Sequence, residues 1–190
     1  MDTSEFWTII EAAREASEAD KPFAEALVDQ LATRTKDDIL GYQERFDELH
    51  GAVYRWDVWA AAYLIGGGCS DDSFMDFRAG LIALGRDWYE RAAACPDSLA
   101  EHPAVTAAAE AYDDEAVFYE NVNYAACNAF KRVTGEEEDF YDACDEYTAS
   151  RDSVGQDAEG MGEDFDFDDP EEMRRRLPRL AALYLRDTPH

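Results

Sequence analysis

The sequence predicts an all-α fold: a compact single domain of six to nine helices, with a long acidic loop before the C-terminal helices. Apolar residues recur at helical spacing along most of the chain, and no stretch of five or more residues alternates in the manner of a strand. Apolar residues make up 46% of the 190 residues, which is enough for a core. The 17 Lys and Arg against 44 Asp and Glu give a net charge of −27.

Helix-start signals divide the first part of the chain. Asp2 and Glu5 fit a capping box before a stripe of apolar residues. Pro22 suits the first turn of a second helix. Thr35 begins a third helix, which continues to about residue 53.

The middle of the chain is expected to hold four more helices. The first spans residues 53–65 and stops at three glycines. Ser70 begins the next, which ends at Gly85. A short helix around Trp88 stops at Pro96, and one long helix covers residues 105–133.

The acidic charge is concentrated late in the chain. Residues 134–172 contain 17 Asp and Glu and one basic residue, for a net charge of −16, while the other 151 residues carry 16 − 27 = −11. We therefore divide the chain into a helical core (1–147), an acidic flexible loop (148–168) and C-terminal helices that pack on the core (169–190). Asp169 and Pro170 form a strong helix start.

Charge and hydropathy exclude several function classes. A strongly acidic chain repels nucleic acid and anionic membranes. The longest apolar run, Val58 to Ile65, has eight residues, whereas a membrane helix needs about 20. The acidic N-terminus lacks the pattern of a secretory signal, so a cytoplasmic location is expected.

Residues 54–86 are the most distinctive part of the sequence. A Trp-Asp-x-Trp helix (residues 56–59) is followed by a Gly-Gly-Cys-Ser-Asp-Asp turn (67–72) and a Phe-Arg helix (77–78). These motifs resemble the bacterial family called domain of unknown function 4240, as do residues 2–10, 96–100 and 177–180. The resemblance implies no established activity. The chain departs from the family's pattern at Gly80, where a Trp is usual, and at Gly66, where an Asn is common.

A polar cluster is predicted around this motif. A carboxylate at Asp57, inside an almost wholly apolar helix, needs a partner, and arginine can supply two hydrogen bonds. The candidates are Arg55, Arg78 and Arg86. An internal clamp between two helices and a ligand pocket both fit the pattern. The full set of candidate residues is Arg55, Trp56, Asp57, Trp59, Ser70, Arg78 and Arg86.

The carboxylates that follow the glycines have two interpretations. Asp71 and Asp72 complement the positive end of a helix dipole after the cap Ser70. Together with Asp76, they would also be candidate ligands for a divalent cation. No other cofactor is predicted.

Nucleophilic catalysis has little support. Cys69 and Ser70 lack a base nearby in the sequence, and the chain has three histidines. Asp164, Asp166 and Asp168 match the first positions of a calcium loop, but the glycine and the final glutamate of that loop are missing.

These observations favour a non-enzymatic, acidic protein-interaction module of adaptor or immunity type, with a basic protein as partner. The alternative is a metal-dependent or small-ligand-binding enzyme that uses the carboxylates around residues 57–76. A third interpretation of the acidity is adaptation to salt.

Overall fold

The computed structural model describes residues 1–18, 20–135, 138–150 and 160–185. In these ranges the chain forms twelve α-helices, one 3-10 helix (η1) and no strand. The all-α class is confirmed, whereas the expected number of helices, six to nine, was too low. The bounds are α1 Thr3–Glu15, α2 Phe23–Ala32, α3 Lys36–Ala52, α4 Trp56–Ile65, α5 Asp71–Ala83, α6 Arg86–Ala94, η1 Pro96–Glu101, α7 Pro103–Ala111, α8 Glu120–Asn123, α9 Ala125–Thr134, α10 Phe140–Ala149, α11 Pro170–Arg176 and α12 Pro178–Tyr184.

The helices begin where short-range capping predicts. The Asp2 carboxylate accepts a hydrogen bond from the backbone N–H of Glu5 at 2.8 Å. Thr35 and Asp38 form a complete capping box at the start of α3. Ser70 accepts from the N–H of Ser73 and caps α5.

The prediction of one long helix over residues 105–133 is wrong. The chain there forms α7, α8 and α9, because α7 ends at Tyr112 in the left-handed conformation (φ 57°). Val117 also has a positive φ, of 71°. The helix predicted from residue 53 starts later, at Trp56, since residues 53–55 form the turn after α3.

Gly80 explains the path of the chain between α7 and α8. A Cβ atom at Gly80 would lie 1.6 Å from the carbonyl oxygen of Val117. The N–H of Tyr119 then donates to the carbonyl oxygen of Asp76 at 3.2 Å. The backbone of this segment therefore lies directly on α5, at a distance that only glycine permits.

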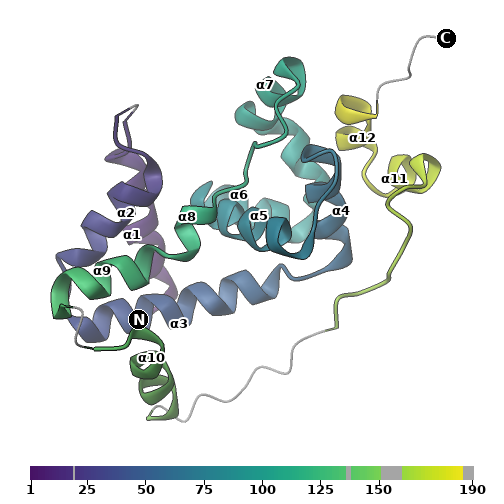
Figure 1. Ribbon diagram of the computed structural model, residues 1–190. Coiled ribbons are helices and arrows are strands. Elements are labelled where there is room, and N and C mark those ends of the chain that lie inside the picture. Colours follow the sequence, from purple (N-terminus) through teal and green to yellow (C-terminus); the bar gives the residue numbers. More distant parts are fainter. Residues whose placement is uncertain (19, 136–137, 151–159, 186–190) are drawn as a thin grey trace.

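One continuous core joins the helices. It contains fully buried side chains from the first helix to the last, including Phe6, Phe74 and Leu180. Figure 1 shows α1, α2 and α9 grouped above α3, while the C-terminal helix α12 lies beside α4 and α7. Among the described residues, no helix is both long enough and apolar enough to cross a membrane.

Asp97 holds the C-terminal helix on the core. Its side chain is 8% exposed and accepts hydrogen bonds from the backbone N–H groups of Arg179 (3.0 Å) and Leu180 (2.9 Å). It also accepts from the Arg179 guanidinium. A buried carboxylate on η1 thus satisfies the free N–H groups at the start of α12.

The predicted acidic loop is only partly described. Its first residues, 148 and 149, belong to α10, and residues 151–159 lie outside the described ranges. Residues 160–169, which we call the strap, contain no helix and contact α4.

Replacing Gly80 tests the close approach of the backbone. Gly80→Ala should lower the free energy of unfolding by about 3 kcal/mol, because the added methyl group meets backbone atoms that cannot move independently. Urea denaturation measures this change. Gly51→Ala is the matched control: a Cβ at Gly51 meets nothing within 4 Å, so stability should rise by about 0.5 kcal/mol. Equal effects of the two substitutions would contradict the packing described here.

Candidate functional site

Four aromatic rings form a continuous stack on α4, α5 and the turn before α4. The Trp56 and Trp59 rings are 5.4 Å apart and nearly parallel, and Trp59 lies 4.6 Å from Phe74. Phe74 in turn stacks on Tyr54 at 5.8 Å. We call these four residues the aromatic stack. Its α4 members are three positions apart, which places them on one side of the helix.

Trp59 also fixes the glycine turn that leads into α5. Its indole N–H donates to the carbonyl oxygen of Cys69 at 3.0 Å. Gly67 and Gly68 supply the positive φ values, 61° and 131°, that the turn needs. The predicted cluster residue Ser70 follows as the cap of α5. The segment from residue 56 to residue 70 therefore packs around the ring of Trp59.

Arg78 lies over the other end of the stack. Its guanidinium carbon is 4.7 Å from the centre of the Tyr54 ring and 5.0 Å from that of Phe74. The guanidinium also donates to Nδ1 (3.0 Å) and to the carbonyl oxygen (3.1 Å) of His50. His50 Nε2 donates to the carbonyl oxygen of Met75 at 2.9 Å. Burial lowers the pKa of His50 to about 4, and Arg78 contributes to the shift.

Asp57 pairs with Arg55 and with neither of the other predicted partners. Two Arg55 nitrogens donate to the Asp57 carboxylate at 2.9 and 2.8 Å, and a third donates to the carbonyl oxygen of Ala93 on α6 at 2.9 Å. Asp57 lies in the first turn of α4 and its side chain is 45% exposed, so its expected burial was wrong. The pair links α4 to α6. Arg86 binds Glu90 instead.

The strap lies against α4 beside the stack. The N–H of Trp56 donates to the carbonyl oxygen of Met161 at 2.9 Å. Phe167 meets Trp56 edge-on at 6.1 Å and lies 5.5 Å from Tyr63. The Tyr63 hydroxyl donates to the Asp168 carboxylate. Trp56 and Tyr63 of α4 therefore form the docking surface for a non-helical part of the same chain.

The family resemblance is confirmed by a comparison of the whole sequence. Residues 1–132 match the family described as protein of unknown function, DUF4240. The chain belongs to this family. No curated protein and no solved structure matches it. The matched part holds the aromatic stack, whereas the strap and the C-terminal helices lie after it, including the Leu177-Pro178-Arg179-Leu180 motif.

The carboxylates of the DUF4240 domain are not assembled into a metal centre. Among the described residues, no group of three or more His, Cys, Asp and Glu side chains could hold an ion. Asp71 and Asp72 are exposed in the first turn of α5. Asp76 accepts a hydrogen bond from the amide of Asn123 at 2.9 Å, and burial, more than nearby Glu120, raises its pKa.

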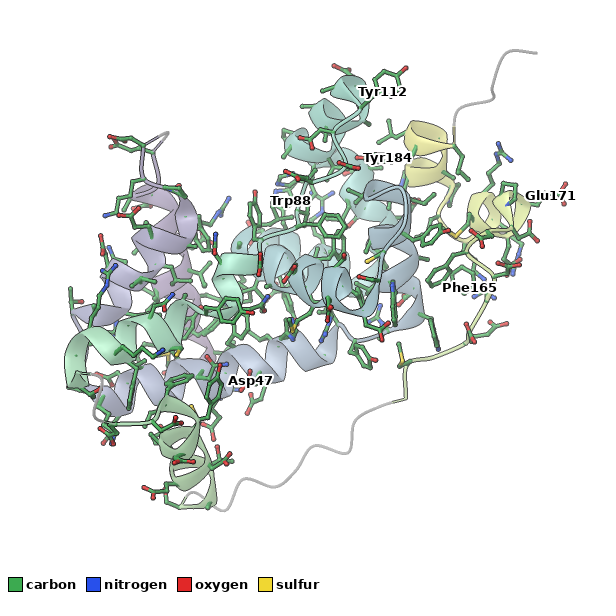
Figure 2. The ribbon with its side chains drawn as sticks, viewed as in Figure 1. Asp47, Trp88, Tyr112, Phe165, Glu171 and Tyr184 are labelled. Atoms are coloured by element: carbon green, nitrogen blue, oxygen red, sulfur yellow. The ribbon has the colours of Figure 1, made fainter. Side chains whose placement is uncertain are left out.

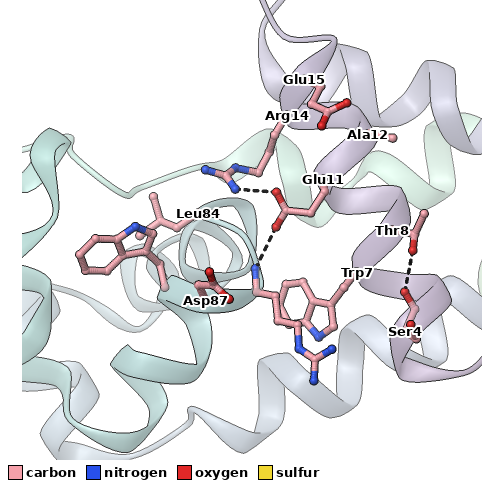
Figure 3. A pocket seen from close by; sticks show the side chains of 11 residues that line it. Ser4, Trp7, Thr8, Glu11, Ala12, Arg14, Glu15, Leu84 and Asp87 are labelled. Atoms are coloured by element: carbon pink, nitrogen blue, oxygen red, sulfur yellow. Dashed lines mark hydrogen bonds and ion pairs between the residues drawn. The ribbon is translucent and has the colours of Figure 1, made fainter.

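A groove of about 700 Å³ lies between α1 and α6 of the DUF4240 domain (Figure 3). Glu11 crosses it: the carboxylate accepts from the Arg14 guanidinium at 2.7 Å and from the backbone N–H of Arg86 at 3.1 Å. Trp7 and Trp88 also line the groove. The charges of Glu11 and Arg14, at the centre of the groove, are therefore already paired with each other.

Cys69 and Ser70, the two candidate nucleophiles, are engaged in structural contacts. Burial raises the pKa of the Cys69 thiol to about 12, which disfavours the thiolate. The Ser70 hydroxyl is 3.0 Å from the Ser73 hydroxyl and also accepts from the Ser73 N–H.

Sequence reasoning missed three features of the site: the contact between Arg78 and His50, the addition of Tyr54 and Phe74 to the stack, and the docking of the strap. One sequence signal points to the last of these. Trp56, Trp59 and Tyr63 share one helical face.

Acid titration tests the state of His50. Its pKa is about 6.5 in an unfolded chain and about 4 in the folded one, so the unfolded state binds more protons between these values. The free energy of unfolding should therefore lose about 3 kcal/mol as the pH falls from 6.5 to 4. The His50→Gln variant should not show this loss of stability. Urea denaturation of both proteins between pH 6.5 and 4 measures the difference. The same pH dependence in both proteins would contradict the assignment.

Proposed function

We propose that the protein is a non-catalytic interaction module that binds a basic protein partner through the end of α7. Residues 110–115, which we call the acidic tip, form the contact surface. The observation that carries the proposal is the conformation and exposure of Tyr112. Its side chain points away from the body of the molecule (Figure 2) and the residue is 81% exposed.

Tyr112 has an unfavourable backbone conformation for its residue type. Its φ of 57° is left-handed, and it stands at the end of a helix, where glycine or asparagine is usual. A left-handed residue that is not glycine costs about 1–2 kcal/mol. Tyr112 therefore combines a strained backbone with a largely exposed ring. Strained, exposed residues are found at functional sites.

The surroundings of Tyr112 fit a cationic ligand. The acidic tip contains four carboxylates, all exposed: Glu110, Asp113, Asp114 and Glu115. Tyrosine is enriched at interface hot spots and binds arginine or lysine through its ring face. A basic partner would place a cation on the ring, and the surrounding carboxylates would raise the association rate.

The rest of the molecule supports a partner of opposite charge. At least twelve of the 17 Lys and Arg already form ion pairs within the chain. The carboxylates outnumber them and dominate the surface charge. The alternative of a metal-dependent or ligand-binding enzyme would use Asp57, Asp71, Asp72 and Asp76. Asp57 binds Arg55 and Asp76 binds Asn123, while Asp71 and Asp72 are exposed in the first turn of α5.

Replacing Tyr112 separates binding from folding. Tyr112→Gly should raise the free energy of unfolding by about 1 kcal/mol, because glycine adopts this φ without strain. The same variant should lose the partner. Thermal unfolding measures the first effect. Affinity capture from a lysate of the native organism at 150 mM salt, with quantitative mass spectrometry, measures the second.

Tyr141→Ala is the matched control, because Tyr141 is 63% exposed on the acidic helix α10. We expect wild type and Tyr141→Ala to enrich the same basic protein, and Tyr112→Gly to recover at least tenfold less of it. Loss of stability in Tyr112→Gly, or capture equal to wild type, would refute the proposal.

A further inference from the structure

The strap contacts α4 as a separate peptide ligand would. Trp56 is the first residue of α4, and its N–H has no acceptor within the helix. The carbonyl oxygen of Met161 supplies that acceptor at 2.9 Å. A backbone hydrogen bond of this kind recognises an extended chain without reference to its side chains.

Two alternating side chains of the strap add specificity. Phe165 and Phe167, two positions apart, lie side by side with their ring centres 5.1 Å apart. Phe167 fills the space between Trp56 and Tyr63, while Phe165 lies under the Arg176 guanidinium at 4.1 Å. Figure 2 shows Phe165 beside α11, between the strap and the C-terminal helices.

The strap differs from the core in its burial and its charge. The Phe165 and Phe167 side chains stay partly exposed, unlike the fully buried rings of the core. Residues 163–169 carry five carboxylates on a chain with a net charge of −27. Arg176 offsets one of them, through its ion pair with Glu163. Repulsion between like charges therefore weakens the closed arrangement.

We propose that this face of α4 is a peptide-binding site that the strap occupies in cis. Its trans ligand is an extended segment of another protein with aromatic residues two positions apart. In this ligand, uncharged or basic residues stand at the positions of Asp164 and Asp166. They are followed by a residue that accepts a hydrogen bond from the Tyr63 hydroxyl. The face belongs to the DUF4240 match and the strap lies outside it. The site shares no residue with the acidic tip, so it does not depend on the function proposed above.

Amide hydrogen exchange tests whether the strap detaches from the folded protein. If it does, the Trp56 amide should exchange at least 100-fold faster than the amide of Ala60 in the centre of α4. Phe167→Ala should accelerate the Trp56 amide about tenfold further and leave Ala60 unchanged. Exchange of Trp56 at the Ala60 rate would show that the strap opens only on global unfolding. Insensitivity to Phe167→Ala would mean that helix fraying is responsible. Either result would overturn the proposal.

Peptide binding tests the site directly. The probe is a fluorescent peptide with the sequence of residues 160–169 carrying Asp164→Asn and Asp166→Asn. By fluorescence anisotropy, it should bind the Phe165→Ala/Phe167→Ala protein at least tenfold more tightly than wild type, because the strap no longer competes. A control peptide with alanine at both phenylalanine positions should not bind. Equal binding of the two peptides, or no binding to the folded variant, would refute the site.

Discussion

The stacking of Trp59 between Trp56 and Phe74 is the contact on which the surrounding structure depends. The ring joins α4 to α5, and its N–H holds the carbonyl oxygen of Cys69 at the end of the glycine turn. With the turn fixed, α5 presents Arg78 to the last turn of α3, where a cation is favourable. The indole thus joins α4 to α5, and Arg78 joins α5 to α3.

Charge acts on this framework in two opposite ways. Where an arginine meets a carboxylate at a helix end, the pair joins distant segments, as Arg179 and Asp97 do between α12 and η1. Most carboxylates have no such partner available, because acidic residues outnumber basic ones by 27. The excess is carried by surface segments such as the strap and the acidic tip. The proposed basic partner and the proposed release of the strap both rest on this charge imbalance.

The sequence predicted the features that depend on neighbouring residues and missed those that depend on tertiary contacts. The caps at Thr35 and Ser70 need only residues within one helical turn, and both are present. The segment that follows the break at Tyr112 crosses α5 at Gly80, about 30 residues earlier in the chain, and helical periodicity carries no sign of this contact. For Asp57, the partner two residues away was among those predicted, whereas the direction of Arg78 is set by the packing of α3 against α5.

Two titratable groups next to the aromatic stack, His50 and Cys69, lie at structural contacts. His50 is held neutral with both ring nitrogens engaged, and Cys69 is held as a thiol by burial. The side chains on which the two proposals rest are aromatic: the exposed Tyr112 at the acidic tip, and the half-buried α4 rings beside the strap. Rings combine a large apolar area with little side-chain entropy, so they suit recognition. Because the α4 rings lie in the family's part of the chain and the strap does not, a change confined to the tail could alter access to the site without altering the fold.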